Sequence, residues 1–123
     1  MNARVDSLHP DVVRWTPVCA VADIVPGTGV CALVDGVHVA IFHVAPLAEV
    51  PRFFAIDNVD PRSRASVLSR GLVGSLGERI VVASPLYKNH FDLASGECIE
   101  TPEHSVRAHA VRVQDGRVQV ALA

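Results

Sequence analysis

Residues 58 to 92 decide the fold of this chain. The stretch opens with Asn58-Val59-Asp60-Pro61 and closes with Ser84-Pro85-Leu86-Tyr87-Lys88-Asn89-His90-Phe91-Asp92. A short apolar run, typical of a buried strand, precedes each of these segments, while residues 62–79 between them are polar and punctuated by glycine. The pattern predicts two loops, each at the end of a strand of a rigid β scaffold.

Two hairpins flank this stretch and share one turn signal. Asp35-Gly36 and Asp115-Gly116 are dipeptides that suit a type I′ turn, because both central residues of that turn need positive φ. The first turn predicts a core face made of the pairs Val34–Val37, Ala32–Val39 and Val30–Ile41. The second predicts the pairs Val113–Val118 and Val111–Val120 on one face, with a solvated face made of Arg112, Gln114, Arg117 and Gln119.

The remaining elements are also short, with turn signals roughly every ten residues. We expect strands over residues 15–24, 53–57 and 80–83, a loop over residues 45–52 and a tight hairpin over residues 93–99. Asp60-Pro61 and Arg70-Gly71 carry the start and stop signals of one short helix. The fold class is therefore all-β, an antiparallel β-sandwich or small barrel. We expect one domain over residues 14–122, preceded by an N-terminal arm over residues 1–13.

The composition excludes several classes of function. Hydrophobic residues make up 50% of the 123 residues and charged residues 20%, as in a folded globular domain. The formal net charge of −2 lacks the basic footprint of a nucleic-acid-binding protein. No apolar run approaches the roughly 20 residues that span a bilayer, and the N-terminus shows no signal-peptide pattern. We expect a cytoplasmic protein with no nucleic-acid or membrane partner.

The cysteines and histidines form no recognised motif. Cys19, Cys31 and Cys98 are odd in number and widely spaced, so they do not indicate a disulfide framework. Their apolar surroundings predict three small core residues. His38 is expected to be half-packed on a strand, and the histidines together with the cysteines lack the spacing of a zinc site. No metal site is predicted.

A nucleophilic triad is also disfavoured. Ser84, His90 and either Asp60 or Asp57 are residue types of such a triad. However, no Gly-x-Ser-x-Gly elbow surrounds Ser84, and Pro85 removes the backbone N–H that often completes an oxyanion hole. No catalytic residue is predicted.

The two loops resemble the paired cluster-binding loops of a Rieske domain, where a C-x-H loop and a C-P-x-H loop hold a [2Fe–2S] cluster. On that pattern Asn58 and Asp60 take the first cysteine and histidine positions, and Ser84 and Tyr87 take the second pair, with Pro85 retained. Bridging iron needs thiolate sulfur, which an amide or a hydroxyl does not supply. The resemblance implies a Rieske-like fold, and the four ligand positions imply that this chain holds no cofactor.

A longer set of segments narrows the resemblance. The segments are residues 58–61, 67–74, 82–88, 91–93, 96–98 and 111–118. Within about residues 14–122 they are similar to the small subunit of the cytoplasmic NADH-dependent assimilatory nitrite reductase. In that family the small subunit lacks the cluster, while a large subunit with FAD, siroheme and an iron–sulfur centre reduces nitrite to ammonium. The resemblance implies a non-catalytic subunit that acts through this large partner.

The polar segment between the two loops is longer than in a compact Rieske ferredoxin, and enlarged loops on a rigid scaffold often carry binding function. We expect this tip to dock on the large subunit, because arginine and tyrosine are enriched in interfaces. The candidate docking residues are Arg62, Arg64, Arg70, Tyr87, Lys88 and His90. The alternative function is a free-standing Rieske-like binding or regulatory module for another oxidoreductase. A neighbouring reading frame for a large siroheme flavoprotein would favour the subunit.

Overall fold

The computed structural model describes residues 13–45 and 50–123, and these ranges hold nine strands and three single-turn 3₁₀ helices. The strands are β1 Thr16–Ala20, β2 Thr28–Val34, β3 Val37–Val44, β4 Arg52–Asp57, β5 Leu72–Leu76, β6 Arg79–Ala83, β7 His90–Asp92, β8 Ala108–Gln114 and β9 Arg117–Ala121. The helices are η2 Val21–Asp23, η3 Leu68–Arg70 and η4 Pro102–His104. The predicted all-β class is confirmed.

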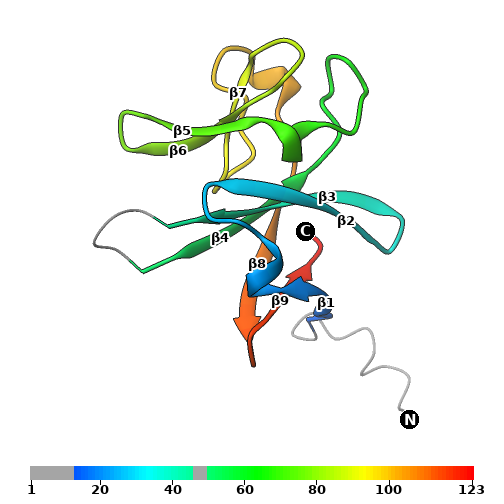
Figure 1. Cartoon of the computed structure of the whole chain (residues 1–123). Coiled ribbons are helices and arrows are strands. Elements are labelled where there is room, and N and C mark those ends of the chain that lie inside the picture. Colours follow the sequence, from blue (N-terminus) through cyan, green and yellow to red (C-terminus); the bar gives the residue numbers. More distant parts are fainter. Residues whose placement is uncertain (1–12, 46–49) are drawn as a thin grey trace.

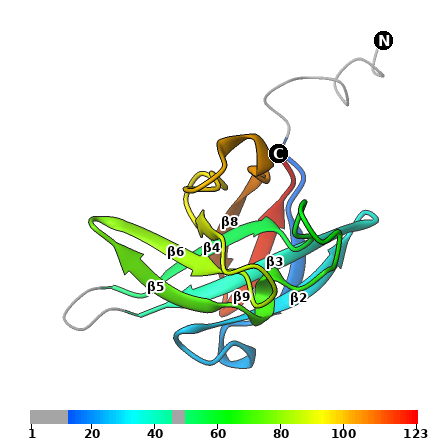
Figure 2. The same cartoon turned by 90° about the horizontal axis from the view of Figure 1, so that it is seen from above.

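The strands form two antiparallel sheets (Figures 1 and 2). Six strands lie in the order β1-β9-β8-β4-β3-β2, in a curled sheet that resembles a nearly closed barrel, and three lie in the order β5-β6-β7. The loops that leave β4 and β6 lie together at one end of the molecule, at the top of Figure 1. We call this end the tip.

The strands β3 and β4 are buried on both faces, which explains why β3 reads as a nearly continuous apolar run. Val39, Ile41 and Ala55 point into the core of the curled sheet, together with Val118 and Val120 of β9. The alternate side chains of β3 and β4 pack on the other face against the small sheet and the tip. This second core contains Ala40, Phe42, Phe54, Ile56, Leu68, Val82, Phe91, Leu93 and Cys98.

Both predicted Asp-Gly hairpins are confirmed in turn and register. Asp35 and Gly36 have φ values of 46° and 82°, and Asp115 and Gly116 have values of 53° and 75°. The β2–β3 ladder pairs Val34 with Val37, Ala32 with Val39 and Val30 with Ile41. The β8–β9 ladder pairs Val113 with Val118 and Val111 with Val120.

Four predictions about the other elements were wrong in part. The strand expected over residues 15–24 ends at Ala20, and Val21–Asp23 form η2. The short helix does not begin at Asp60-Pro61, because residues 61–63 form a turn, and only the last three residues before Gly71 are helical. Residues 72–76 are strand β5 rather than loop, since the two-residue turn Gly77-Glu78 pairs them with β6. The hairpin over residues 93–99 is reduced to a turn and the single bridge between Phe91 and Cys98.

The exposure of the cysteines differs from the prediction for one of them. Cys98 is buried and Cys19 is half-buried, but Cys31 is exposed. Cys31 lies on β2, the edge strand of the curled sheet, and the neighbouring Leu33 on the same face is also exposed. The predicted arm over residues 1–13 lies outside the described residues except for Val13, and so do residues 46–49 of the loop over residues 45–52. The domain limits of 14–122 therefore stay a prediction.

Asp57, at the end of β4, joins this strand to β8. Its Oδ1 accepts a hydrogen bond from Nε2 of His109 at 2.8 Å, and its Oδ2 accepts bonds from the backbone N and Nε of Arg107 at 3.1 and 3.3 Å. Nδ1 of His109 accepts a bond from the backbone N–H of Ala123, so the ring donates through Nε2. Burial opposes the ionisation of Asp57, but the hydrogen bonds from His109 and Arg107 outweigh it and hold the pKa of Asp57 below its ordinary value.

This lowered pKa predicts a defined acid sensitivity. A carboxyl whose pKa is lower in the folded than in the unfolded chain stabilises the fold above its unfolded pKa of about 4, and the contribution is lost as the pH falls through the folded value. We expect Asp57→Asn to lower the free energy of unfolding at neutral pH and to flatten its decrease on acidification. Denaturant titrations at a series of pH values measure both effects. An acid dependence unchanged from the parent chain would contradict this role, and Asp115→Asn in an exposed turn is the control.

Gly71 packs closely against the end of β6. A Cβ at this position would lie 2.2 Å from the carbonyl oxygen of Ala83 and 2.7 Å from Cγ2 of Val82. The φ of −73° is ordinary, so the position requires glycine for space and not for backbone conformation.

We expect Gly71→Ala to lower the free energy of unfolding by about 3 kcal/mol, because backbone as well as side-chain atoms must move. Gly74→Ala is the matched control, since a Cβ there meets nothing within 4 Å. Urea titration of both variants measures the difference, and equal stabilities would contradict the close approach.

Candidate functional site

Three of the four residues at the cluster-ligand positions are buried where the two tip loops meet. Asn58, Asp60 and Ser84 are inaccessible to solvent, whereas Tyr87 is about half exposed, with a relative accessibility of 49%. Asn58 and Asp60 follow β4, and Ser84 follows β6, as the sequence predicted. The fold therefore brings together residues that lie far apart in the chain.

The two loops are joined by a direct hydrogen bond between two of these positions. The hydroxyl of Ser84 donates to Oδ2 of Asp60 at 2.6 Å, and the backbone N–H of Arg62 donates to Oδ1 at 2.9 Å. The Oγ of Ser84 also accepts a long bond from the N–H of Leu86 at 3.4 Å. A buried carboxylate is thus bonded on both oxygens, as burial of such a group requires.

Asn58 makes hydrogen bonds within the first loop through both its side-chain amide and its backbone carbonyl. Its Oδ1 accepts a hydrogen bond from the backbone N–H of Ser69 at 2.6 Å, and its Nδ2 donates to Oγ of Ser66 at 2.7 Å. Its backbone carbonyl accepts bonds from the N–H groups of Val67 and Leu68 at 3.0 Å. The amide therefore fixes the return of the loop towards η3.

Tyr87, the fourth position, makes a second contact between the loops at the surface. The guanidinium carbon of Arg62 lies over the Tyr87 ring, 4.5 Å from its centroid. A cation over an aromatic face is attracted by the ring quadrupole. This pair therefore joins the same two loops as the buried hydrogen bond between Ser84 and Asp60.

This arrangement does not fit the [2Fe–2S] cluster of a Rieske domain. The four positions offer an amide, a carboxylate, a hydroxyl and a phenol, and none of these is the thiolate that bridges iron in such clusters. Asp60 and Ser84 are in direct contact, so their side chains satisfy each other. No group of three or more histidine, cysteine or acidic side chains suited to a metal ion occurs in residues 13–45 and 50–123.

The same geometry disfavours the triad. The Ser84 hydroxyl donates to Asp60, while Nδ1 of His90 bonds the Glu100 carboxylate at 2.6 Å. Serine and histidine are therefore engaged in separate pairs. Burial is the largest single effect and raises the pKa of Glu100. The hydrogen bonds from the backbone and the ring of His90 outweigh burial together and hold this pKa below its ordinary value.

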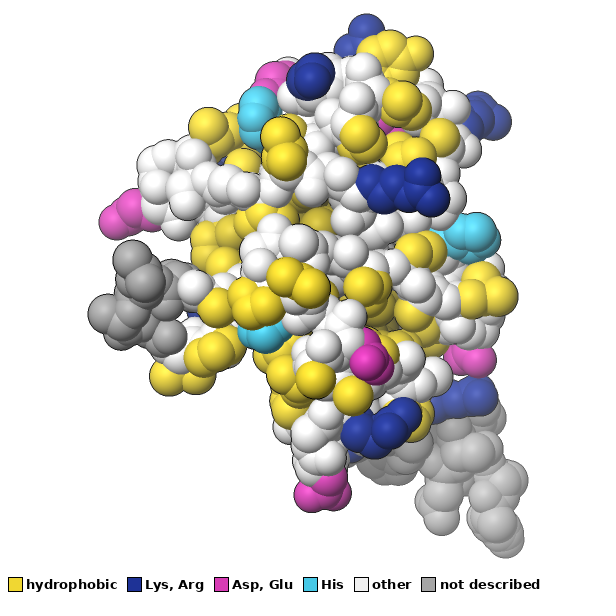
Figure 3. All heavy atoms as spheres, viewed as in Figure 1, with side chains coloured by type: hydrophobic (Ala, Val, Ile, Leu, Met, Phe, Trp, Pro, Cys, Tyr) yellow, Lys and Arg dark blue, Asp and Glu magenta, His cyan; other side chains and the backbone are white. Residues whose placement is uncertain are grey.

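Four basic residues of the tip are exposed, and none of them has an acidic partner among the described residues. Within the described part of the chain, no carboxylate lies within 4.0 Å of Arg62, Arg64, Arg70 or Lys88. Basic side chains gather at the tip in Figure 3, with hydrophobic side chains between them. The exposed hydrophobic residues there include Val59, Leu86 and Tyr87. His90 differs from the other predicted docking residues because it is paired with Glu100.

Two of these basic residues adopt a backbone conformation that favours glycine. Arg64 and Lys88 both have a φ of 63°. A left-handed conformation costs a residue with a Cβ roughly 1–2 kcal/mol. The backbone N–H groups of both residues close turns, to the carbonyl of Asp60 and to that of Ser84 respectively. The turns thus hold two cationic side chains at the tip at some cost in stability.

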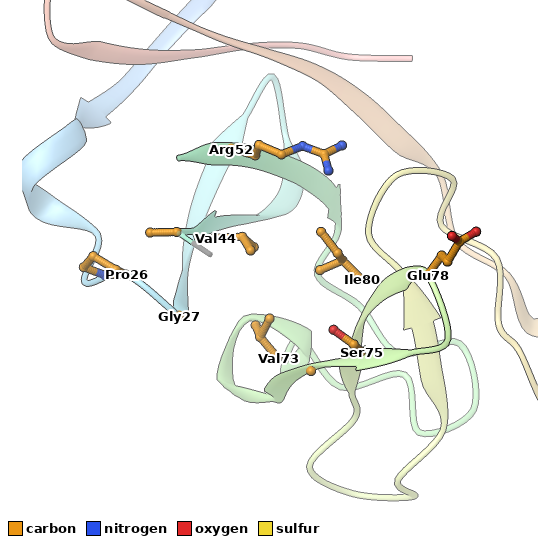
Figure 4. Close-up of a pocket in the computed structure, with 10 residues that line it drawn as sticks. Pro26, Gly27, Val44, Arg52, Val73, Ser75, Glu78 and Ile80 are labelled. Carbon is orange, nitrogen blue, oxygen red and sulfur yellow. The ribbon is translucent and has the colours of Figure 1, made fainter. Parts of the chain in front are cut away.

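Several cavities border the small sheet. A cavity of about 560 Å³ opens between this sheet and the ends of β3 and β4, where Val44, Val73 and Ile80 line it and Arg52 and Glu78 are its charged residues (Figure 4). A smaller one of about 190 Å³ lies between Arg70 and Lys88. The smaller one is also lined by Ser84, whose hydroxyl donates to Asp60.

Sequence reasoning placed the four ligand positions but missed their mutual contacts. The available signal was the complementary chemistry of two ligand positions, since Asp60 is an acceptor and Ser84 is a donor. The contact between Arg62 and Tyr87 had no comparable signal, because Arg62 has no counterpart among the ligand positions.

The bond between Ser84 and Asp60 yields a direct test. We expect Ser84→Ala to lower the free energy of unfolding at neutral pH by about 3 kcal/mol, because it leaves a buried carboxylate short of a donor. Ser63→Ala is the control, since Ser63 is half-buried and its hydroxyl accepts only from the N–H of Ala65. Chemical denaturation measures both, and equal losses would show that the bond does not hold the loops together.

Known proteins resemble this chain in sequence and in fold. The model of the Rieske-like [2Fe-2S] domain matches residues 14–121. The nitrite reductase (NADH) small subunit of Salmonella typhimurium is 48% identical over 107 residues, which cover 87% of this chain and 96% of that one. A crystal structure from Mycobacterium tuberculosis, assigned as an NADH-dependent nitrite reductase small subunit, is 42% identical with a TM-score of 0.84. That match covers 92% of this chain and 98% of the other.

A third relative is a larger protein. Part of the nitrite reductase [NAD(P)H] large subunit of Klebsiella oxytoca is 36% identical over 106 residues, which cover 86% of this chain and 11% of that protein. No helix in the described part of the chain is long and apolar enough to cross a membrane. On its sequence and its fold, the chain belongs to the Rieske-like domain family, among the small subunits of NADH-dependent nitrite reductase.

Proposed function

We propose that this chain is a small, non-catalytic subunit of a cytoplasmic NAD(P)H-dependent nitrite reductase. It supports the reduction of nitrite to ammonium by binding a large subunit, and that partner would carry FAD, siroheme and an iron–sulfur cluster. The observation that carries the proposal is the hydrogen bond between Ser84 and Asp60, which engages two of the four cluster-ligand positions with each other. To support nitrite reduction, a domain without a redox group of its own would need a partner that has one.

The Klebsiella relative supports association with a large subunit. That protein contains a stretch similar to this chain within a single, much longer polypeptide named as a nitrite reductase large subunit. The occurrence of similar sequences both within a large chain and as a separate chain supports contact between this domain and a large subunit.

The tip surface is the candidate contact area, and we define it by Arg62, Arg64, Arg70, Tyr87 and Lys88. Its cations have no acidic partner within the described residues, and exposed hydrophobic side chains lie beside them. Interfaces are enriched in arginine and tyrosine, and a basic patch favours an acidic partner surface. Arg64 and Lys88 adopt left-handed backbone conformations that cost stability. This cost favours a role for their charge in binding and not in folding.

We expect the double charge reversal Arg70→Glu/Lys88→Glu to weaken association with the large subunit by at least about tenfold, because it replaces attraction by repulsion. A tagged copy expressed in its host on nitrite as nitrogen source provides the assay, and the siroheme and flavin absorbance of the captured material provides the readout. Arg112→Glu/Arg117→Glu, on the hairpin at the opposite end of the molecule, is the matched control.

A second variant separates docking from folding. Lys88→Gly removes one cation and relieves a left-handed backbone, so it should raise the melting temperature of the isolated chain while it weakens capture. Capture that is unchanged in both tip variants would refute the tip as the contact area. A colourless capture that contains no siroheme flavoprotein would refute the subunit proposal and favour a binding module for another oxidoreductase.

A further inference from the structure

The strand β5 is an edge strand without the usual protection against pairing. It lies at the end of the three-stranded sheet, and its register with β6 runs from Leu72–Ala83 to Leu76–Arg79 without a bulge. Its sequence, Leu-Val-Gly-Ser-Leu, contains no charged residue and no proline. Leu72 and Leu76 are exposed, with relative accessibilities of 80% and 41%. Proteins normally place lysine, proline or a bulge on such an edge, and an unprotected edge is a template for another strand.

The hairpin turn determines which backbone groups face the free edge. The two-residue turn Gly77-Glu78, with Gly77 at a φ of 61°, makes Leu76 and Arg79 a hydrogen-bonded pair. Leu72, Gly74 and Leu76 therefore bond to β6, and the N–H and C=O groups of Val73 and Ser75 point outward. Neither residue makes a backbone bond to another described segment outside its ladder.

This edge is complementary to itself. When two copies of β5 lie antiparallel with Gly74 opposite Gly74, the outward groups of Val73 face those of Ser75 in the second copy, and the two such pairs make about four hydrogen bonds. Leu72 then lies opposite Leu76 of the second copy in a non-hydrogen-bonded pair, where side chains come closest. A shift of the register by two residues would leave one outward residue of each copy without its partner.

The charges at the two ends of β5 favour the same arrangement. Arg70 precedes the strand and Glu78 follows it, and both are exposed. Antiparallel pairing brings the basic end of one strand to the acidic end of the other, twice in a symmetric dimer. The β5–β6 hairpin projects to one side of the body in both ribbon views (Figures 1 and 2).

We propose that β5 pairs with β5 of a second copy of this chain, in the register centred on Gly74, and joins two small sheets into one. The contact involves a five-residue strand on each side, far less than the roughly 1,600 Å² of a standard interface, so the dimer is weak and depends on concentration. This surface adjoins the tip surface at Arg70, and the pairing of β5 does not require the proposed function.

A symmetric disulfide tests the register. In a Cys31→Ser background, Gly74→Cys places two thiols on the two-fold axis, where a non-hydrogen-bonded pair has a Cα separation of about 4.5 Å, within the range of a disulfide. A Cβ fits at Gly74 without contact in the single chain. We expect disulfide-linked dimers to form about tenfold faster than with Leu33→Cys, an equally open position on β2, and the excess to disappear with Ser75→Pro, which removes an outward N–H.

Charge substitutions give a second test that does not depend on proline. Leu72→Lys/Leu76→Lys puts like charges opposite each other across the dimer, and Leu72→Lys/Leu76→Glu puts opposite charges there. Sedimentation velocity over a roughly hundredfold range of concentration should show dimers for the parent chain and the second variant, but not for the first.

Three outcomes would overturn the proposal. They are a parent chain that stays monomeric throughout, two charge variants that behave alike, and cross-linking rates that are equal at positions 74 and 33. A monomeric chain whose Ser75→Pro variant no longer captures the large subunit would assign the edge to that partner and not to a second copy. All these variants leave the residues of the tip surface unchanged.

Discussion

The hydrogen bond from Ser84 to Asp60 is the constraint on which the tip depends. In a Rieske domain the two loops are held by four ligands to one cluster, which fixes their separation through metal–ligand bonds. Here one buried bond of 2.6 Å takes that place, and a single such bond holds far less energy than a metal centre. The rest of the attachment is distributed over the bonds of Asn58 within its own loop, the contact between Arg62 and Tyr87, and the close approach of Gly71 to β6.

The replacement changes what the tip can offer to other molecules. A cluster needs an environment that controls its potential and its access to solvent. When the loops do not have to enclose a cluster, their outer residues are free to carry charge. Arg64 and Lys88 stand in turns where glycine would be more stable, so the tip combines a rigid, fully bonded interior with a surface whose composition is not set by folding.

The sequence predicted structure best where the signal lay within a few neighbouring residues. The Asp-Gly turns fix both conformation and register within a few residues, and the two hairpins were predicted down to their pairs. The strand β5 was missed because Gly74 and Ser75 interrupt its apolar pattern, and the position of Gly77 at the first place of a two-residue turn was the signal overlooked. The exposure of Cys31 could not be predicted, since it depends on how far the second layer extends over the edge of the curled sheet. The contacts of Asp60 and Arg62 with the second loop join residues that spacing alone does not pair.

The burial of β3 and β4 on both faces has a consequence for how the domain comes apart. Each of these strands supplies one row of side chains to the curled sheet and the alternate row to the small sheet and the tip. Neither layer keeps a complete core when the other is removed, so the two cannot melt as separate units. The domain should therefore open in one concerted transition, in which amide protons of β6, near the tip, exchange with solvent at the same free energy as those of β9 at the far side of the barrel.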